Sequence, residues 1–221
     1  AKSLAGSKCE HAWRTQRPAS DWQGFSANLK EVVKLSREEA RLRSEAKGCT
    51  PYDALLDIFE PDMTSARLDV LFGDMKSWLP DLLANVVEKQ AQRSFIPPQG
   101  PFPTATQREL GLEAMKMLGF DFNGGRLDVS AHPFCGGVPE DVRITTRYDE
   151  DELLSALFGV IHETGHARYE QNLPRAWAGQ PIALARSTAI HESQSLFFEM
   201  QLGRSEAFLR HLLPAVHARF G

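Results

Sequence analysis

Apolar side chains recur every three or four residues along most of the chain, which is the spacing expected of amphipathic α-helices. This periodicity predicts helices over residues 28–46, 64–92 and 104–118, each with charged side chains on its opposite face. Pro80 lies inside the second of these helices, where a proline kinks or interrupts the backbone. Apolar helical patterns also occur on either side of residue 162 and near the C-terminus, so we predict a mainly α-helical fold.

One region departs from this pattern. Residues 126–130 and 141–147 alternate polar and apolar side chains and are rich in β-branched types, and a glycine-rich stretch lies between them. We expect two antiparallel strands that form a small sheet beside the following helix. Its edge is suited to hold an extended peptide by main-chain hydrogen bonds, and the alternative is a hairpin that only braces the helix. Arg143 and Arg147 share a strand face, either as contacts for a substrate carboxylate or as surface charges.

Composition narrows the class of protein. At 221 residues and 42% apolar content the chain can bury one sizeable core, so we expect a single domain. A net charge of −4 gives no reason to expect nucleic acid or an anionic membrane as partner. No apolar run approaches the roughly 18 residues of a transmembrane helix. The three cysteines are widely spaced without a CxxC, which favours reduced thiols and a cytoplasmic location.

The segment with the clearest chemistry is the pentapeptide His162-Glu163-Thr164-Gly165-His166. On a helix the two histidines lie about 40° apart, so both imidazoles can bind one metal ion. Glu163 lies one position along, where its carboxylate can reach a metal-bound water without ligating the metal. The alternative is a pair of hydrogen-bonded core histidines, because the residues that lead into the motif are apolar and buried imidazoles need polar partners.

A catalytic zinc ion needs a third protein ligand and an open position. Glu192 is the best candidate, because it follows His166 at a distance that allows a second, antiparallel helix to return. That helix is otherwise apolar, and an unpaired carboxylate on it is unfavourable. His191 is an alternative ligand, although it points about 100° away around the helix. Glu199 lies two turns further on nearly the same face, where it either orients a histidine ligand or forms an ion pair.

Four short motifs give the chain a family resemblance. It resembles the carboxypeptidase Taq family of metallocarboxypeptidases, whose ordered motifs include HPF, DxRxT, HExxH and HESxSxxxE. The matching segments occur here in the same order: His132-Pro133-Phe134, Asp141-Val142-Arg143-Ile144-Thr145, the pentapeptide above, and His191-Glu192-Ser193-Gln194-Ser195 with Glu199.

The resemblance implies a zincin-like metallopeptidase of long helices that removes single residues from peptide C-termini. It implies metal ligation by His162, His166 and Glu192, with Glu163 as general base. Zinc is the expected metal, with cobalt or manganese as substitutes because nitrogen and oxygen ligands discriminate weakly between these ions. The resemblance also makes His132 a candidate for substrate binding, His191 and Glu199 candidates for contacts to the ligands, and a homodimer the expected assembly.

Two later motifs of the family, I/V-R-x-x-A-D and G-x-x-Q-D-x-H-W, do not occur in this sequence. The first supplies the arginine expected to hold the substrate's C-terminal carboxylate. We therefore expect residues 1–221 to form a single but incomplete catalytic domain. The alternatives are a catalytically impaired fragment and another gluzincin activity, an aminopeptidase or endopeptidase, which HExxH with a distant glutamate does not distinguish.

Overall fold

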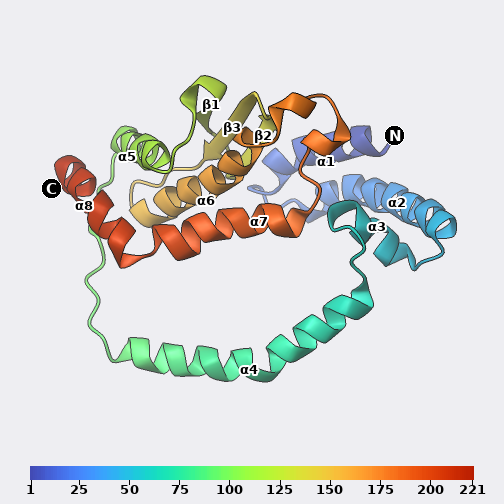
Figure 1. Ribbon diagram of the computed structural model, residues 1–221, viewed down its shortest axis with the longest axis horizontal. Helices are drawn as coiled ribbons and strands as arrows, with labels where there is room; N and C mark the ends of the chain where they lie inside the picture. Colours follow the sequence, from blue (N-terminus) through green and yellow to red (C-terminus); the bar gives the residue numbers. More distant parts are fainter. The chain divides into compact units, whose positions relative to one another are not determined.

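The computed structural model describes residues 1–221, and most of them are α-helical, as the sequence predicts (Figure 1). Contacts within the chain divide it into two compact units, residues 1–93 and residues 94–221. That both units belong to one catalytic domain stays a prediction. No helix in either unit is long and apolar enough to cross a lipid bilayer.

The first unit consists of four helices, and three of them begin with a side-chain N-cap. The side chain of Asp21 accepts the backbone N–H of Gly24 at the start of the second helix, and Gly48 ends that helix with φ +69°. Thr50 caps the third helix, where Pro51 occupies the first position. The second helix packs against the first and the third. The four helices are α1 (Lys2–Gln16), α2 (Trp22–Lys47), α3 (Pro51–Phe59) and α4 (Ser65–Ala91).

Helix α4 confirms the helix predicted over residues 64–92 and the kink predicted at its proline. Thr64 is the N-cap, and the helix continues through Pro80 without a break. Figure 1 shows α4 bending about its middle, and Pro80 belongs to the central part of its range Ser65–Ala91. A proline removes one backbone hydrogen bond and crowds the preceding turn, so a bend is the expected result.

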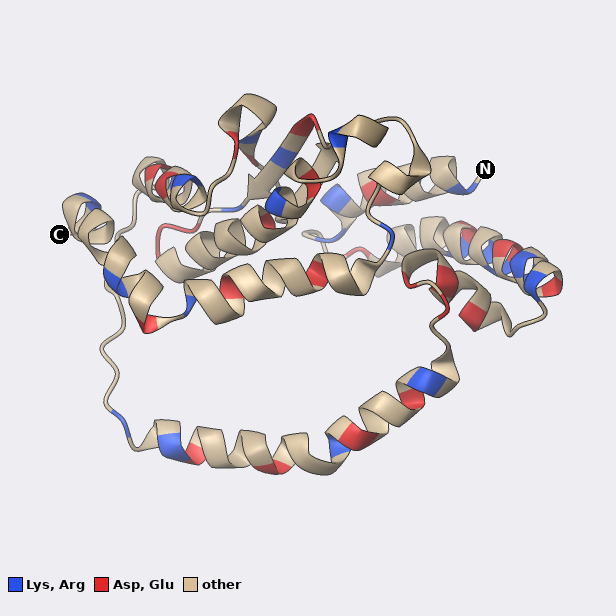
Figure 2. Ribbon diagram, in the orientation of Figure 1, with Lys and Arg blue, Asp and Glu red and all other residues tan.

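Charges of both signs are interspersed along α2 (Figure 2). Arg41 pairs with Glu45 and Arg43 pairs with Glu39, each at 2.8 Å and each one helical turn apart. Exposed pairs of this kind contribute only about 0.3–0.5 kcal/mol each. They therefore support a solvated helix face rather than a concentrated patch of one sign.

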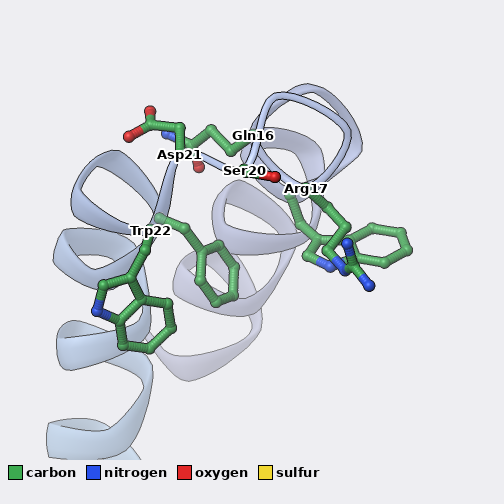
Figure 3. A pocket seen from close by; sticks show the side chains of 7 residues that line it. Gln16, Arg17, Ser20, Asp21 and Trp22 are labelled. Atoms are coloured by element: carbon green, nitrogen blue, oxygen red, sulfur yellow. The ribbon is translucent and has the colours of Figure 1, made fainter.

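An open pocket of about 300 Å³ lies where the end of α1, the connection and the start of α2 meet (Figure 3). The rings of Trp22 and Phe25 lie 6.0 Å apart on one side of it. None of the residues that line it belongs to the site predicted from the sequence. The lining residues are Trp13, Gln16, Arg17, Ser20, Asp21, Trp22 and Phe25.

The second unit contains the remaining helices and one sheet. Its elements are α5 (Thr104–Met117), β1 (Gly125–Val129), β2 (Phe134–Val138), β3 (Asp141–Thr146), α6 (Leu153–Gln171), α7 (Thr188–Leu196) and α8 (Glu206–Phe220). Short 3₁₀ turns cover Phe122–Gly124, Arg175–Trp177 and Pro181–Ala183. A π-helical segment, Phe197–Gly203, continues directly from α7.

The sheet corrects the strand pairing expected from the sequence. It has the order β1-β3-β2, in which β1 runs parallel to β3 and β2 runs antiparallel to it. The two predicted strands are present, but they are parallel, so the prediction of an antiparallel pair is wrong. The reason is that the glycine-rich connection forms a third strand, β2, which returns the chain beside β3 through a two-residue turn.

Strand β2 contains two glycines, Gly136 and Gly137, although glycine is unfavourable in strands. Glycine is depleted in strands, yet Gly137 has φ +113°, and a Cβ atom on it would lie 2.1 Å from the carbonyl oxygen of Asp141. Only glycine allows this approach at the turn between β2 and β3. The residue type that argued against a strand is therefore the one that the hairpin requires.

Helix α6 is the centre of this unit. It packs against α5 and α7 and against strands β2 and β3, and Figure 1 shows it between the sheet and α7. Val160 of α6 joins Ile144 of β3 in one buried apolar cluster, and Ile161 joins Leu110 of α5 and Leu212 of α8 in another. Full burial of a side chain of this size stabilises the fold by about 1.5–3 kcal/mol. This packing makes α6 a rigid support for the pentapeptide on it.

Candidate metal centre

The pentapeptide lies in the second half of α6. The helix begins at Leu153, and the carboxylate of Glu152 caps it by accepting the backbone N–H groups of Leu154 and Ser155. His162 and His166 are one turn apart on the helix, with ring centroids 5.0 Å apart. Their side chains are largely but not fully covered, at 21% and 17% exposure. Both imidazoles therefore remain reachable from one side.

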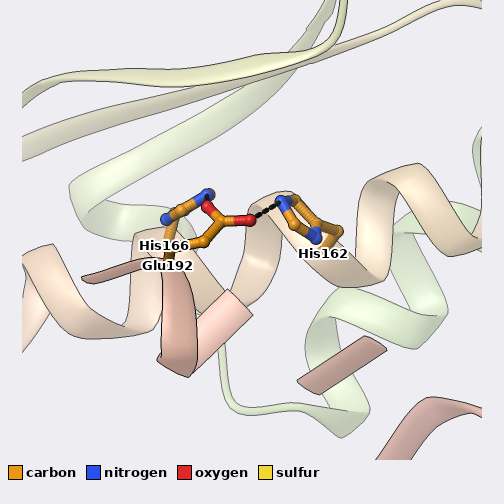
Figure 4. A group of neighbouring side chains, drawn as sticks. All are labelled: His162, His166 and Glu192. Carbon is orange, nitrogen blue, oxygen red and sulfur yellow. Dashed lines mark ion pairs between the residues drawn. The ribbon is translucent and has the colours of Figure 1, made fainter. Parts of the chain in front are cut away.

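Helix α7 brings Glu192 to the two histidines (Figure 4). Its Oε1 lies 3.8 Å from His162 Nε2, and its Oε2 lies 3.3 Å from His166 Nε2. One donor atom from each of the three side chains lies within 4.8 Å of the other two. The side chain of Glu192 is 47% exposed, so the cluster opens toward solvent on the side of this carboxylate.

Gly165 sets the distance between α6 and α7. A Cβ atom at this position would lie 2.6 Å from Ser195 Cα and 2.9 Å from the carbonyl oxygen of Gln194. Ser195 is completely buried there, and its hydroxyl donates to the carbonyl of Glu192 at 2.7 Å. The absence of a side chain at Gly165 therefore allows the two backbones to approach closely, which holds Glu192 near the histidines.

Glu163 lies on a different side of α6 and is buried, at 7% exposure. Burial raises the pKa of its carboxyl group to about 7, and the negative charge of Glu192 adds to this effect while His162 opposes it. The thiol of Cys135 on β2 has a pKa raised to about 12, chiefly by burial and then by the charge of Glu163. Val160 and Ala167, which share a helix face with Glu163, belong to the apolar cluster that Cys135 packs against, so this side of α6 faces the edge strand β2.

The Nδ1 atoms of both histidines, which are their outer nitrogens because Nε2 is the nitrogen near Glu192, have hydrogen-bond partners. His162 Nδ1 lies 3.1 Å from Glu199 Oε2, and Arg204 donates to the other oxygen of Glu199 at 2.6 Å. His166 Nδ1 lies 2.7 Å from His191 Nδ1. Burial, followed by the proximity of His191, lowers the pKa of His166 to about 4. His191 and Glu199 thus contact the two histidines, and Glu199 also forms an ion pair with Arg204, while their roles at a metal site stay predictions.

The three candidates for substrate contact lie in or beside the sheet. His132 is exposed in the connection before β2, and its backbone carbonyl accepts a hydrogen bond from Thr145 at 3.2 Å. Val142 and Ile144 face α6, so Arg143 points to the opposite face of the sheet, where it pairs with Asp141 at 2.6 Å. Arg147 is exposed just beyond the end of β3.

The sequence motifs did not predict contacts of Glu170, Arg204 or Gly165 at this site. Glu170 follows His166 by one helical turn, and its carboxylate lies 2.7 Å from His191 Nε2. The spacing of four residues between His166 and Glu170 could have indicated this contact, because residues four apart share a helix face. The contact of Arg204 with Glu199 and the role of Gly165 depend on the packing of α7, which the sequence pattern does not show.

Two histidines from one helix and a carboxylate from the next form a group that could hold a metal ion, with donors of the His₂Glu type. The family model described as carboxypeptidase Taq (M32) metallopeptidase matches residues 1–221. The chain belongs to this family, which confirms the resemblance inferred from its four motifs.

Relatives of known name agree with this assignment. The chain is 42% identical over 205 residues to carboxypeptidase 1 of Bacillus subtilis, covering 91% of this chain and 40% of that protein. It is 41% identical over 226 residues to thermostable carboxypeptidase 1 of Thermus thermophilus, covering 98% of this chain and 44% of that protein. The structure of Trypanosoma cruzi metallocarboxypeptidase 1 matches with 52% identity and a TM-score of 0.86, covering 100% of this chain and 44% of that one. The chain therefore spans less than half the length of these relatives.

Proposed function

We propose that this chain carries the catalytic metal site of a carboxypeptidase that removes single residues from peptide C-termini. The observation that carries the proposal is the convergence of His162, His166 and Glu192, whose donor atoms lie within 4.8 Å of one another in a chain of this family. The names of the relatives support the direction of cleavage.

The three side chains fit a divalent metal ion. Two imidazole nitrogens and one carboxylate oxygen are a ligand set that zinc adopts in hydrolases, with one position left for water or substrate. The half-exposed side chain of Glu192 leaves that position accessible. We propose zinc as the ion, and cobalt or manganese would use the same donors. When bound, the metal supplies Lewis-acid polarisation of the scissile carbonyl and of the attacking water.

In this mechanism Glu163 moves the proton. Burial raises the pKa of its carboxyl group to about 7 in the metal-free chain, so this group is able to exchange a proton near neutral pH. It can therefore accept a proton from the attacking water and donate it to the amine that leaves, which is the behaviour required of a general acid–base group. Glu199 and His191 would orient the two histidines through their outer nitrogens.

The edge strand β2 is the element that we propose to hold the peptide. It contacts α6 on the side of Glu163, and one of its edges is not paired with another strand of the sheet. An extended peptide can add to such an edge through backbone hydrogen bonds. His132 stays a candidate contact because it lies two residues before the start of β2. Contact of Arg143 and Arg147 with a substrate carboxylate stays a prediction. The ion pair of Arg143 with Asp141 favours the alternative, in which Arg143 is a surface charge.

A peptide substrate is the only partner that this mechanism requires. The homodimer and the cytoplasmic location stay predictions, as does the expectation that neither nucleic acid nor a membrane is a partner. All three cysteines are free in the structure.

The test compares three peptides of one sequence on the zinc-loaded protein. One is blocked at the N-terminus with a free C-terminus, one is blocked at both ends, and one has a free N-terminus and an amidated C-terminus. We expect hydrolysis of the first alone, with release of one amino acid, whereas zinc binding without hydrolysis of any of the three would identify the catalytically impaired fragment. Cleavage of the doubly blocked peptide would instead identify an endopeptidase, and cleavage of the third an aminopeptidase.

Variants of the same protein test the assigned roles. Glu163→Gln should retain zinc and lose turnover by several orders of magnitude, because the base is absent. Glu206→Gln, which changes an exposed glutamate paired with Arg210, is the matched control and should behave as the parent. Undiminished turnover of the Glu163 variant rules out the general-base role.

A further inference from the structure

We propose that Glu170 and His191 form a hydrogen-bonded relay that fixes the tautomer and the orientation of His166 for metal binding. This inference rests on the proposed metal site and adds Glu170 to it as a positioning residue. The relay runs along one side of α6 and crosses to α7 at His191.

Two short contacts make up the relay. His191 Nε2 lies 2.7 Å from Glu170 Oε1, and His191 Nδ1 lies 2.7 Å from His166 Nδ1. These three side chains are 19%, 25% and 17% exposed for His191, Glu170 and His166. Because all three are mostly covered, water competes poorly for these hydrogen bonds.

The order of donors and acceptors follows from the carboxylate. An ionised carboxylate only accepts, so His191 donates to Glu170 through Nε2–H. In neutral His191 the other ring nitrogen, Nδ1, is then an acceptor. His166 must donate to it through Nδ1–H, which leaves the lone pair of His166 on Nε2. That is the nitrogen 3.3 Å from Glu192, on the side where the metal would bind.

Two tilted ring contacts hold His191 in place. Its ring lies 4.6 Å from the ring of Tyr169 and 4.8 Å from that of His166, measured between centroids. The ring is therefore fixed from two sides, and Glu170 fixes its rotation. A ligand whose outer N–H is already paired loses less freedom when it binds a metal, and loss of such a partner usually weakens binding about 10–100-fold.

The second histidine gives an internal comparison. His162 reaches a carboxylate directly, through Glu199, whereas His166 reaches one only through His191. Changes at Glu170 should therefore act on the metal chiefly through His191. This dependence distinguishes a relay from two independent contributions.

The test measures the zinc affinity of the full chain by competition with a chelator, with the absorption spectrum of the Co²⁺ form as a second readout. His191→Phe keeps an aromatic ring but removes the acceptor, and we expect zinc affinity to fall about 10–100-fold. His191→Asn restores an acceptor near the position of Nδ1 and should recover part of the loss. Glu170→Leu should lower affinity about tenfold in the parent chain and have no further effect in the His191→Phe background.

Glu113→Leu is the matched control, because Glu113 is also a half-covered, ion-paired glutamate on a helix of the second unit. It should leave zinc affinity unchanged. Far-UV circular dichroism without metal identifies any variant that does not fold. If one of His191→Phe, His191→Asn and Glu170→Leu does not fold, the zinc affinities of the other two test the relay. Parent-like affinity in His191→Phe and Glu170→Leu, or additive effects of the two, would overturn the relay. A parent chain that does not bind zinc through His162 would instead refute the proposed metal site.

Discussion

Replacement of Gly165 by alanine tests how closely α6 and α7 must approach for the metal site to form. The added Cβ atom would lie 2.6 Å from Ser195 Cα, 2.9 Å from the carbonyl oxygen of Gln194 and 3.0 Å from Phe198 Cβ. The first two contacts are to backbone atoms, which do not rotate away. A normal contact between carbon atoms is about 3.5–4.0 Å, so the two helices must separate by roughly 1 Å.

Two opposing effects set the change in stability. Overpacking of a buried contact costs about 1–3 kcal/mol, whereas alanine is favoured over glycine inside a helix by about 1 kcal/mol. The expected net destabilisation is therefore about 0–2 kcal/mol, which leaves the chain folded. The effect on metal binding is larger, because ligand distances tolerate only about ±0.2 Å and Glu192 moves with α7. We expect zinc affinity to fall at least about tenfold.

Gly159 provides the matched control on the same helix. A Cβ atom at this position meets nothing within 4 Å, so Gly159→Ala should stabilise the chain by up to about 1 kcal/mol and leave zinc affinity unchanged. Urea denaturation of the metal-free chain and chelator competition measure the two quantities. If Gly165→Ala binds zinc as tightly as Gly159→Ala, the close approach of the helices does not position Glu192, and the reasoning fails.

Two further predictions concern buried titratable groups. The raised pKa of Glu163 means that its contribution to the stability of the metal-free chain is complete below its ordinary pKa of 4.5 and is lost as pH rises through about 7. Glu163→Gln should remove this loss of stability. The variant should therefore be more stable than the parent by about 3 kcal/mol at pH 8, but not at pH 4. Equal urea midpoints of variant and parent at pH 8 would contradict the burial of a charged carboxylate. Cys135, with its pKa raised to about 12, should react with iodoacetamide at pH 8 at least about a hundredfold more slowly than the exposed Cys49, as measured by peptide mass spectrometry. Equally fast alkylation of both thiols would show that Cys135 is accessible.

The sequence was sufficient to predict several helices whose apolar periodicity is long and regular, but it did not predict α1 or α3. The helix predicted over residues 64–92 is present as α4, and the helix that carries His162 and His166 is present as α6. The pentapeptide also indicated which side chains share a face, since four residues make about one helical turn. Local geometry of this kind follows from the sequence alone.

The pairing of the strands did not follow in the same way. Alternating patterns identify a strand, but they do not say which neighbour it pairs with or in which direction. The stretch around Gly136 and Gly137 resembles a loop by composition, and it becomes β2 because of close contacts with residues 141–143 that only the folded chain brings together. Without that strand, two segments joined by a short connection are expected to be antiparallel.

The two helices of the metal centre run antiparallel, and this makes their motifs a single pattern. Along α6, a stripe of residues one turn apart comprises Phe158, His162, His166 and Glu170. The returning chain meets this stripe in reverse order: His191 contacts Glu170 and His166, Glu199 contacts His162, and the guanidinium of Arg204 lies 4.1 Å from the ring of Phe158. The register of these contacts fixes which residue reaches which partner, and the π-helical segment that carries Glu199 belongs to that register, as such segments often do at functional sites. The spacing within the second motif is therefore set by the spacing within the first, because both motifs form one interface between two helices.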